Sequence, residues 1–426
     1  MRTRAPASPP VPFPLIRLLS VASVASVVLV ACGGASSHAR TAADANGEVI
    51  QMEELRITAR QTGDGMAFDS YDAETLFFRA TALLNQRRCP DAVTLYDRIA
   101  DEFPGSRYRS PALYNAGLCL QDAEQREEAV RRFTRLVEEE PNSPDVKHAR
   151  FQLAQLHVEL EQYDEALEIA DGLLRGRELS SDERMEAMAR RSQALLGQDD
   201  LDDAERQARS AVTYYRTRPE DERVRDEFFA AAANYVLAEA LRKKASALQI
   251  PEANVDDQRM VLERRAQVML RAQREYFNTM TLTNPHWSTA AGYQIGAMYD
   301  AFWNDIMAAP TPPPTEALPP GTEEVYADEY RQELARLVEP LIRHAIRYWE
   351  LTLMMVERAN VQTEWTAQIR SDLDRARRRL LTEPGEAPMP ETGSQGSQES
   401  PEPASEGEPR GAETGGELGA PGASAP

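Results

Sequence analysis

Side chains that could carry out catalysis or bind a metal are few in this 426-residue sequence. The five histidines are widely separated, and none lies near another histidine or a cysteine at the spacing of metal ligands. A Gly-rich phosphate loop, a nucleophile elbow and a Ser/His/Asp neighbourhood do not occur. The 69 acidic residues are spread along the chain, as is typical of solvated helix faces. We therefore expect a protein that is not an enzyme and has neither a metal site nor a cofactor.

The charge of the chain restricts its partners. The formal net charge is −21, from 48 basic and 69 acidic residues. Nucleic acids require a basic binding face, and anionic lipid head groups attract basic segments. The composition therefore argues against nucleic-acid binding and against broad contact with anionic lipids.

Cys32 has the clearest chemical signature. It follows an apolar run from Leu18 to Ala31, whose 14 residues are too few to span a bilayer as a helix. The sequence Leu29-Val30-Ala31-Cys32 resembles the lipobox of bacterial lipoproteins, in which the signal peptide is removed before the cysteine and the cysteine is acylated. The alternative is an ordinary signal peptide with a chance cysteine. The resemblance implies a lipoprotein signal peptide over 1–31 and a lipid on Cys32. Gly33 favours sorting to the periplasmic face of the outer membrane.

A repeat of 37 residues organises the chain from about Tyr71 to Leu174. Small residues recur at two places in each unit, and bulky apolar residues follow the second of them. The recurring residues are Ala80, Gly117 and Ala154, then Ala92, Ala129 and Ala166, then Tyr96 and Phe133, then Ile99, Leu136 and Leu173, and finally Pro104 and Pro141. Small residues let two helices cross closely, the bulky residue fills the space beside them, and proline ends the unit. The pattern predicts helices over 72–86, 90–102, 110–123, 126–139, 147–160 and 163–174.

This pattern resembles the tetratricopeptide repeat (TPR). The runs YDRIADEFPGSRY and FTRLVEEEPNSPDVKHA are similar to TPR lipoproteins of the bacterial envelope, such as that of the β-barrel assembly machinery and the periplasmic partner of the Tol system. The resemblance implies an all-α, TPR-like α-solenoid of helix-turn-helix repeats that binds partner proteins.

The remaining regions follow from composition. We expect a flexible tether over 32–70, TPR repeats over 71–220, enlarged helical repeats with a capping helix over 221–382, and a disordered acidic tail over 383–426. Within the tether, Val49 to Ile57 is more apolar than its surroundings. This stretch is either a strand that adds to a partner's sheet or, as the sequence favours, a semi-ordered segment lying on the first repeat.

The TPR resemblance places one aromatic residue of each unit in the concave groove, at Phe77, Tyr114 and Phe151. The same inner faces carry Glu74, Asp122, Glu159 and His148. Aromatic rings with acidic edges would suit an extended or helical peptide that bears arginine or lysine. Packing of the rings between neighbouring repeats is the alternative, and the sequence does not decide between the two.

Cys89 and Cys119 fall in adjacent units. Because adjacent repeats stack in parallel, a disulfide is compatible with the fold in an oxidising periplasm, but two buried reduced thiols are slightly favoured.

These observations predict a non-catalytic scaffold or adaptor lipoprotein that binds envelope proteins or peptides with basic segments. Its machinery would be that of outer-membrane assembly, secretion, division or motility. The alternative is a cell-wall enzyme or enzyme activator with a site in residues 250–380.

Overall fold

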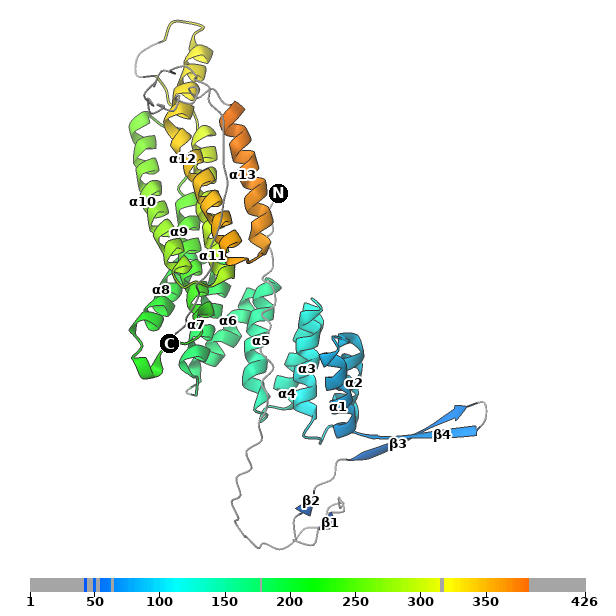
Figure 1. Ribbon diagram of the computed structural model, residues 1–426. Coiled ribbons are helices and arrows are strands. Elements are labelled where there is room, and N and C mark those ends of the chain that lie inside the picture. Colours follow the sequence, from blue (N-terminus) through cyan, green and yellow to red (C-terminus); the bar gives the residue numbers. More distant parts are fainter. Residues whose placement is uncertain are drawn as a thin grey trace, which may run out of the picture. The chain divides into compact units, whose positions relative to one another are not determined.

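A computed structural model describes residues 42–43, 49–50, 54–62, 65–176, 178–314 and 318–382. Thirteen α-helices follow one another in this part of the chain (Figure 1). The expected signal peptide, Cys32 and the acidic tail lie outside the described residues.

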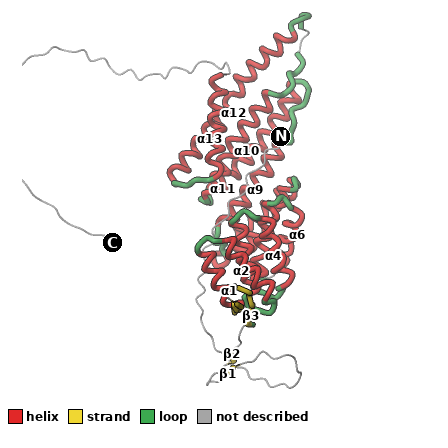
Figure 2. Tube along the Cα trace, turned by 90° about the vertical axis from the view of Figure 1, so that its right-hand side faces the viewer, coloured by secondary structure: helices red, strands yellow, loops and turns green. Residues whose placement is uncertain are grey.

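The first eight helices form four helix-turn-helix pairs, each packed on the next (Figure 2). They are α1 (Ala73–Asn85), α2 (Cys89–Glu102), α3 (Arg109–Asp122), α4 (Arg126–Glu139), α5 (Asp145–Glu159), α6 (Tyr163–Arg175), α7 (Ser181–Gly197) and α8 (Leu201–Thr217). The bounds of α1 to α6 agree with the predicted helices within two residues. The odd-numbered helix of each pair is its first helix and the even-numbered one its second.

The same turn joins the two helices of every pair. One residue of each turn has a left-handed backbone conformation, with φ between 59° and 63°: Arg87, Glu124, Glu161 and Asp199. The N–H group of the following residue then donates to a carbonyl five residues earlier, as from Arg88 to Leu83 at 2.9 Å. This bond satisfies a carbonyl at the end of the first helix and reverses the chain within three residues.

The recurring spacing of small and bulky residues builds the core of each pair. A Cβ atom added to Gly117 in α3 would lie 2.6 Å from the ring of Phe133 in α4, so only glycine allows this ring to lie there. The reference alanines Ala92, Ala129 and Ala166 are fully buried. The close helix crossing expected from the sequence is therefore present.

The later helices are longer. They are α9 (Glu227–Ser246), α10 (Val255–Met280), α11 (Pro285–Met307), α12 (Glu323–Ala359) and α13 (Glu364–Thr382), after a short 3-10 helix, η1 (Glu220–Glu222). The small-and-bulky design recurs here, because Gly296 of α11 leaves room for the fully buried Trp349 of α12. The proline-rich segment before α12 packs back on that helix: the Tyr326 hydroxyl donates to the Pro312 carbonyl at 3.1 Å.

Four strands precede the first helix: β1 (Ala42–Ala43), β2 (Val49–Ile50), β3 (Leu55–Thr62) and β4 (Gly65–Asp72). β1 pairs with β2, and β3 pairs with β4, both antiparallel. The expectation of a flexible tether up to residue 70 is therefore wrong for the segment of β3 and β4. The turn signal Gly63-Asp64-Gly65 and the alternating residues around it were present in the sequence.

No helix among the described residues is long and apolar enough to cross a membrane.

Candidate protein-interaction face

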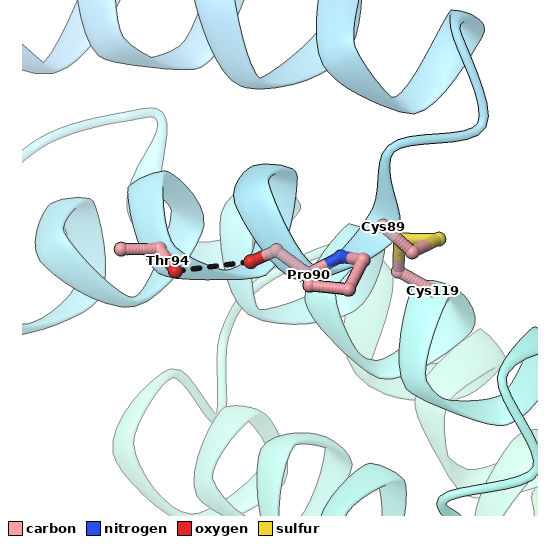
Figure 3. The surroundings of a disulfide bond; sticks show 4 residues. All are labelled: Cys89, Pro90, Thr94 and Cys119. Carbon is pink, nitrogen blue, oxygen red and sulfur yellow. Dashed lines mark hydrogen bonds between the residues drawn. A yellow bond between two sulfur atoms is a disulfide. The ribbon is translucent and has the colours of Figure 1, made fainter.

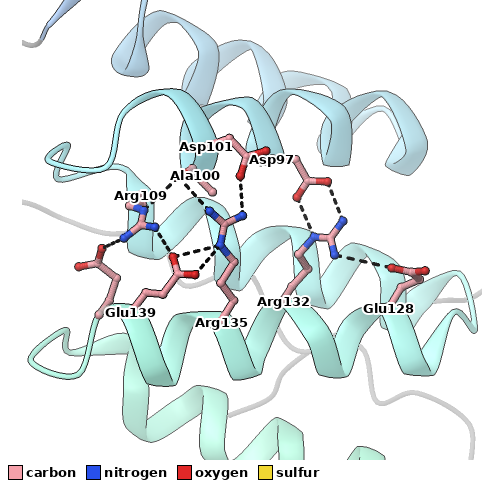
Figure 4. Close-up of polar contacts among 9 residues, drawn as sticks. Asp97, Ala100, Asp101, Arg109, Glu128, Arg132, Arg135 and Glu139 are labelled. Carbon is pink, nitrogen blue, oxygen red and sulfur yellow. Dashed lines mark hydrogen bonds and ion pairs between the residues drawn. The ribbon is translucent and has the colours of Figure 1, made fainter.

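The arginines on the second helices of the first two repeats are bound to carboxylates of the protein itself. Arg132 of α4 binds Asp97 of α2 through two hydrogen bonds of 2.7 and 2.8 Å, and Arg135 binds Asp101 at 2.6 Å (Figure 4). Arg135 also donates to the Ala100 carbonyl at 3.3 Å. These contacts join equivalent helices of adjacent repeats, so the arginines of this face stabilise the stacking of the repeats.

The first helices present aromatic rings instead. Phe77 of α1 is half-buried and lies 5.1 Å from the ring of Tyr108 and 5.7 Å from that of Tyr96. Phe78 is 60% exposed and also contacts Tyr108, with ring centroids 6.2 Å apart. Arg107 stacks over Tyr108 at 4.9 Å and lies 3.6 Å from Glu74. Phe77 and Glu74 are thus part of a surface aromatic cluster at the start of the solenoid.

Tyr114 of α3 occupies the equivalent position in the second repeat. Its ring is half-buried and packs edge-on against Phe133, with centroids 5.6 Å apart. Burial raises the pKa of the Tyr114 hydroxyl, and a hydrogen bond with Gln152 of α5 opposes this shift. Part of Tyr114 therefore serves the packing between repeats, while the rest remains open to a partner.

Phe151 of α5 does not fit the predicted aromatic row. It is 5% exposed and packs with Leu173 of α6 and Ala187 of α7. The alternative of packing between repeats holds for this residue, because the first helix of the fourth unit covers it. Among the described residues no ring contact joins Phe77, Tyr114 and Phe151 to one another, so they do not form a continuous ladder.

Of the predicted acidic residues, one is on the surface and another is buried in an ion pair. Asp122, the last residue of α3, is on the surface, and partial desolvation raises the pKa of its carboxyl. Within the described part of the chain it has no ion pair. Glu159, its equivalent in α5, is only 9% exposed and pairs with Arg126 at 2.9 Å, so it is not available as predicted. His148 is exposed.

Linked polar side chains continue from Glu159 toward the fourth unit. Gln155 donates to Glu159 at 2.8 Å, and the buried Arg190 of α7 donates to Gln155 at 2.9 Å. Glu186 lies 3.8 Å from Arg190, and burial raises the pKa of Glu186 to about 7. The polar groups of these residues bind one another, so α5 and α7 offer few of them to a partner protein. The candidate surface for a partner is therefore on α1 and α3.

We name this surface the α1/α3 face. It comprises Glu74, Phe77, Phe78, Tyr108, Tyr114 and Asp122. Phe78 and Tyr108 were not predicted from the sequence. Phe78 has no aromatic equivalent 37 residues later, where the chain has Asn115. Tyr108 lies 37 residues after Tyr71, so the repeat period did carry a signal for it.

A disulfide joins the first two repeats. Cys89 begins α2, directly before Pro90, and is bonded to Cys119 of α3 (Figure 3). The two Cα atoms are 5.4 Å apart, within the usual range for a disulfide. The slight preference for two reduced thiols is therefore wrong, and the stacking of adjacent repeats does bring the two cysteines together.

Buried charges of the later helices are paired across helix contacts. Arg265 of α10 pairs with Asp305 of α11, and Asp300 of α11 pairs with Arg379 of α13 at 2.8 Å. Burial lowers the pKa of His286, which lies 3.7 Å from Glu364. No cluster of three or more potential metal ligands occurs in the described parts of the chain. These pairs connect neighbouring helices, as structural ion pairs do.

Comparison with known proteins agrees with this fold. Residues 114–184 match the profile of the tetratricopeptide repeat family. The fold is an all-α, TPR-like solenoid, as predicted. Proteins of this class are generally non-catalytic adaptors that bind other proteins.

Solved structures with a similar fold share little sequence with the chain. A tetratricopeptide repeat protein from Parabacteroides merdae is 13% identical over 72% of this chain and 98% of its own, with a TM-score of 0.35. A TPR repeats protein from Bacteroides fragilis is 15% identical over 63% and 98%, with a TM-score of 0.26. The assembly chaperone of RpL4, Acl4, is 16% identical over 73% and 97%, with a TM-score of 0.33. No curated protein matches the chain in sequence.

Proposed function

We propose that this protein is a non-catalytic scaffold of the Gram-negative envelope. A lipid on Cys32 anchors it to the periplasmic face of the outer membrane. There it binds proteins or peptides with basic segments through the α1/α3 face, within the machinery of outer-membrane assembly, secretion, division or motility.

The observation that carries the proposal is the Cys89–Cys119 disulfide within a TPR-like solenoid. Structural disulfides persist in oxidising compartments such as the bacterial periplasm and are rare in the cytosol. A solenoid leaves one face of each first helix for partners, so the fold supports the scaffold role. The lipobox-like sequence at Cys32 supports the same compartment independently.

The chemistry of the α1/α3 face supports a basic partner. Asp122 lies at the end of α3, where the helix dipole is negative and disfavours a carboxylate. Desolvation raises its pKa further, so a lysine or arginine of a partner would relieve both effects. At the opposite end of the face, the exposed ring of Phe78 offers a surface for a cation–π contact.

The anchor is tested by replacing Cys32 with serine. Wild-type protein should sediment with outer membranes and show the added mass of lipid, whereas Cys32→Ser should be released into the soluble periplasmic fraction. A wild-type protein without lipid mass, or a mutant that stays equally membrane-bound, would contradict the anchor.

The interaction face is tested by two Phe→Ala variants that differ in burial. Phe78→Ala, at an exposed ring, should weaken co-purification of partners by about 1–3 kcal/mol while leaving the melting temperature nearly unchanged. Phe151→Ala, at a buried ring, should lower stability by about 3–5 kcal/mol but leave binding by the folded fraction intact. Quantitative affinity purification and thermal unfolding measure the two effects. Unchanged partner recovery with Phe78→Ala would remove this face from the proposal.

The alternative of a cell-wall enzyme or activator with a site in residues 250–380 receives no support from the described residues. Two buried acids of this region bind groups on neighbouring helices: Asp300 of α11 pairs with Arg379 of α13, and Asp372 of α13 accepts a hydrogen bond from Tyr293 of α11 at 3.1 Å.

A further inference from the structure

The hairpin of β3 and β4 has main-chain groups with no partner in its own sheet. Among the residues that the structure describes, β3 pairs with β4 alone, from Leu55 opposite Asp72 to Thr62 opposite Gly65. In a two-stranded sheet, alternate N–H and C=O groups of each strand point away from the other strand. Such a hairpin is only marginally stable by itself in water. The outer edge of β3 is therefore a template for a further strand.

The base of the hairpin is fixed to the first repeat, so the edge is presented by a firm support. The Tyr71 hydroxyl donates to Glu102 of α2 at 2.6 Å, and Arg98 stacks over the Tyr71 ring at 4.4 Å. Arg56, opposite Tyr71, lies over the ring of the buried Phe103 at 5.4 Å. Asp72 then begins α1 by accepting a hydrogen bond from the Thr75 N–H at 2.7 Å. The face of the hairpin that carries Tyr71 and Arg56 is thus occupied at its base.

The opposite face carries apolar side chains that no other residue in the described part of the chain covers. By the strand register, Leu55, Ile57 and Phe68 lie on this face, and they are 58%, 66% and 69% exposed. Exposed apolar residues beside an open strand edge favour association with another chain. Their exposure indicates that the hairpin is completed by a partner and not by its own solenoid.

The charge of β3 indicates what kind of strand completes it. Its charged residues are Arg56 and Arg60, whereas those of β4 are Asp69 and Asp72. Arg56 already forms an ion pair with Glu54, the residue before the strand, at 3.6 Å. Directly opposed like charges on neighbouring strands destabilise a sheet, and opposite charges stabilise it. In the antiparallel register centred on Thr58, a second copy of β3 would place Arg56 opposite Arg60. In a second copy of β4, Asp72 is already bound to the start of α1. An acidic edge strand of another protein avoids both conflicts.

We propose that β3 is a docking strand. It adds by main-chain hydrogen bonds to an acidic edge strand of a β-sheet in a partner protein, and Leu55, Ile57 and Phe68 extend the apolar face of that sheet. This mode of recognition uses the backbone for affinity and alternate side chains for specificity. A helix cannot replace the strand, because its own N–H and C=O groups are already bonded within the helix.

The location of the partner rests on the proposed function, because it assumes the lipid anchor on Cys32. The chemistry of the partner does not depend on that anchor. With a lipid on Cys32, 22 residues lie between the anchor and Leu55. A fully extended chain of that length spans at most about 80 Å, so the partner's sheet would lie within this distance of the membrane.

The test uses the full chain in its native cells, with the photo-reactive residue p-benzoylphenylalanine at position 68. After irradiation, mass spectrometry of the cross-linked peptides identifies the partner and the residue that was attached. We expect attachment to an edge strand of a β-sheet that contains acidic residues. The same probe at Phe78, an exposed position of α1, controls for proximity and should give a different cross-linked site.

Two lysine variants test whether the apolar face of the hairpin matters, or whether any added charge on β3 weakens docking. Ile57→Lys places a charge on the apolar face and should lower the cross-linking yield about tenfold, as edge charges oppose strand addition. Thr58→Lys adds the same charge on the opposite face of the same exposed strand and should leave the yield unchanged within about twofold. Equal loss of cross-linking yield with both variants would overturn the proposal. Cross-linking of position 68 to a helix, to lipid or to a second copy of this chain would also overturn it, as would the absence of any cross-linked product.

The outcomes also distinguish this proposal from the proposed function. Strand cross-links from a protein without lipid mass would refute the anchor and keep the docking strand. Lipid on Cys32 without strand cross-links would refute the docking strand alone.

Discussion

The first two junctions between repeats use equivalent positions and different chemistry. Cys89 and Arg126 are 37 residues apart, and each is the first residue of the second helix in its repeat. Cys89 forms a disulfide with Cys119 in the next repeat, whereas Arg126 forms an ion pair with Glu159 in the next repeat. The first residue of the second helix is thus one place where each of these repeats is bound to the next, beside ion pairs such as Arg132–Asp97.

The third junction supports this interpretation with a third kind of contact. Tyr163 begins α6, and its ring lies over Gly197, the last residue of α7, so closely that a Cβ atom there would overlap the ring. Each junction therefore joins one repeat to the next at the same position of the repeat. The contact is a covalent bond at the first junction, an ion pair at the second and an aromatic ring packed on glycine at the third. The comparison teaches that the backbone of the repeat fixes the place of the junction, and the side chains fix its strength.

Breaking the disulfide should have the largest effect. The bond closes a loop with a sequence separation of 30, and a cross-link of this size stabilises a protein by about 3–4 kcal/mol, chiefly by restricting the unfolded chain. Urea unfolding with and without reductant should show this difference. In the Cys89→Ala/Cys119→Ala double variant, reductant should have no effect, which controls for its action elsewhere. An identical midpoint for oxidised and reduced wild-type protein would contradict the prediction.

The junctions also show what the sequence could and could not predict. Residue spacing within one repeat predicted the helices, because small and bulky residues such as Gly117 and Phe133 meet inside a helix pair. Contacts between repeats depend on how one pair stacks on the next, which no local pattern encodes. For that reason the sequence slightly favours two reduced thiols over the disulfide that is present.

The same limit explains the mixed outcome for the candidate site. Phe151 and Glu159 were expected in the groove, but their surroundings are supplied by α7 and by Arg126, which lie in other helices. The left-handed backbone conformation in the turns could not be predicted from the sequence either, because Arg87 and Glu124 are not residue types that favour it. The overall composition of residues 32–70 predicts a tether, because it averages the apolar alternation of β3 with the Gly-, Ser- and Asp-rich residues around it.

Replacing Arg126 should have an intermediate effect. Arg126→Met keeps the length of the side chain but leaves the carboxylate of Glu159, which is 9% exposed, without its cation. We expect a loss of about 2 kcal/mol in the free energy of unfolding, as for a charged hydrogen bond that is removed from one side. Chemical denaturation measures it.

Two controls isolate the cause of that loss. Arg131 pairs with Glu128 on the surface of the same helix, so Arg131→Met should cost no more than about 0.5 kcal/mol. The double variant Arg126→Met/Glu159→Gln removes the unpaired charge and should recover most of the stability lost in the single variant. If the double variant is as unstable as Arg126→Met, the loss comes from packing and the ionic description of this junction is wrong.

The third junction should be the weakest of the three. Gly197→Ala forces the Tyr163 ring aside, but both residues are half-buried, so the ring can rotate toward solvent. We expect a loss of about 1 kcal/mol in the free energy of unfolding, at the low end for overpacking. The matched control is Gly172→Ala in α6, where an added Cβ meets no atom closer than 3.8 Å. Alanine is favoured over glycine inside a helix by about 0.5–1 kcal/mol, so this variant should be stabilised. Opposite signs for these two glycine substitutions would show that the ring contact, and not helix propensity, sets the cost at Gly197. Stabilisation by both would mean that Tyr163 contributes nothing to this junction.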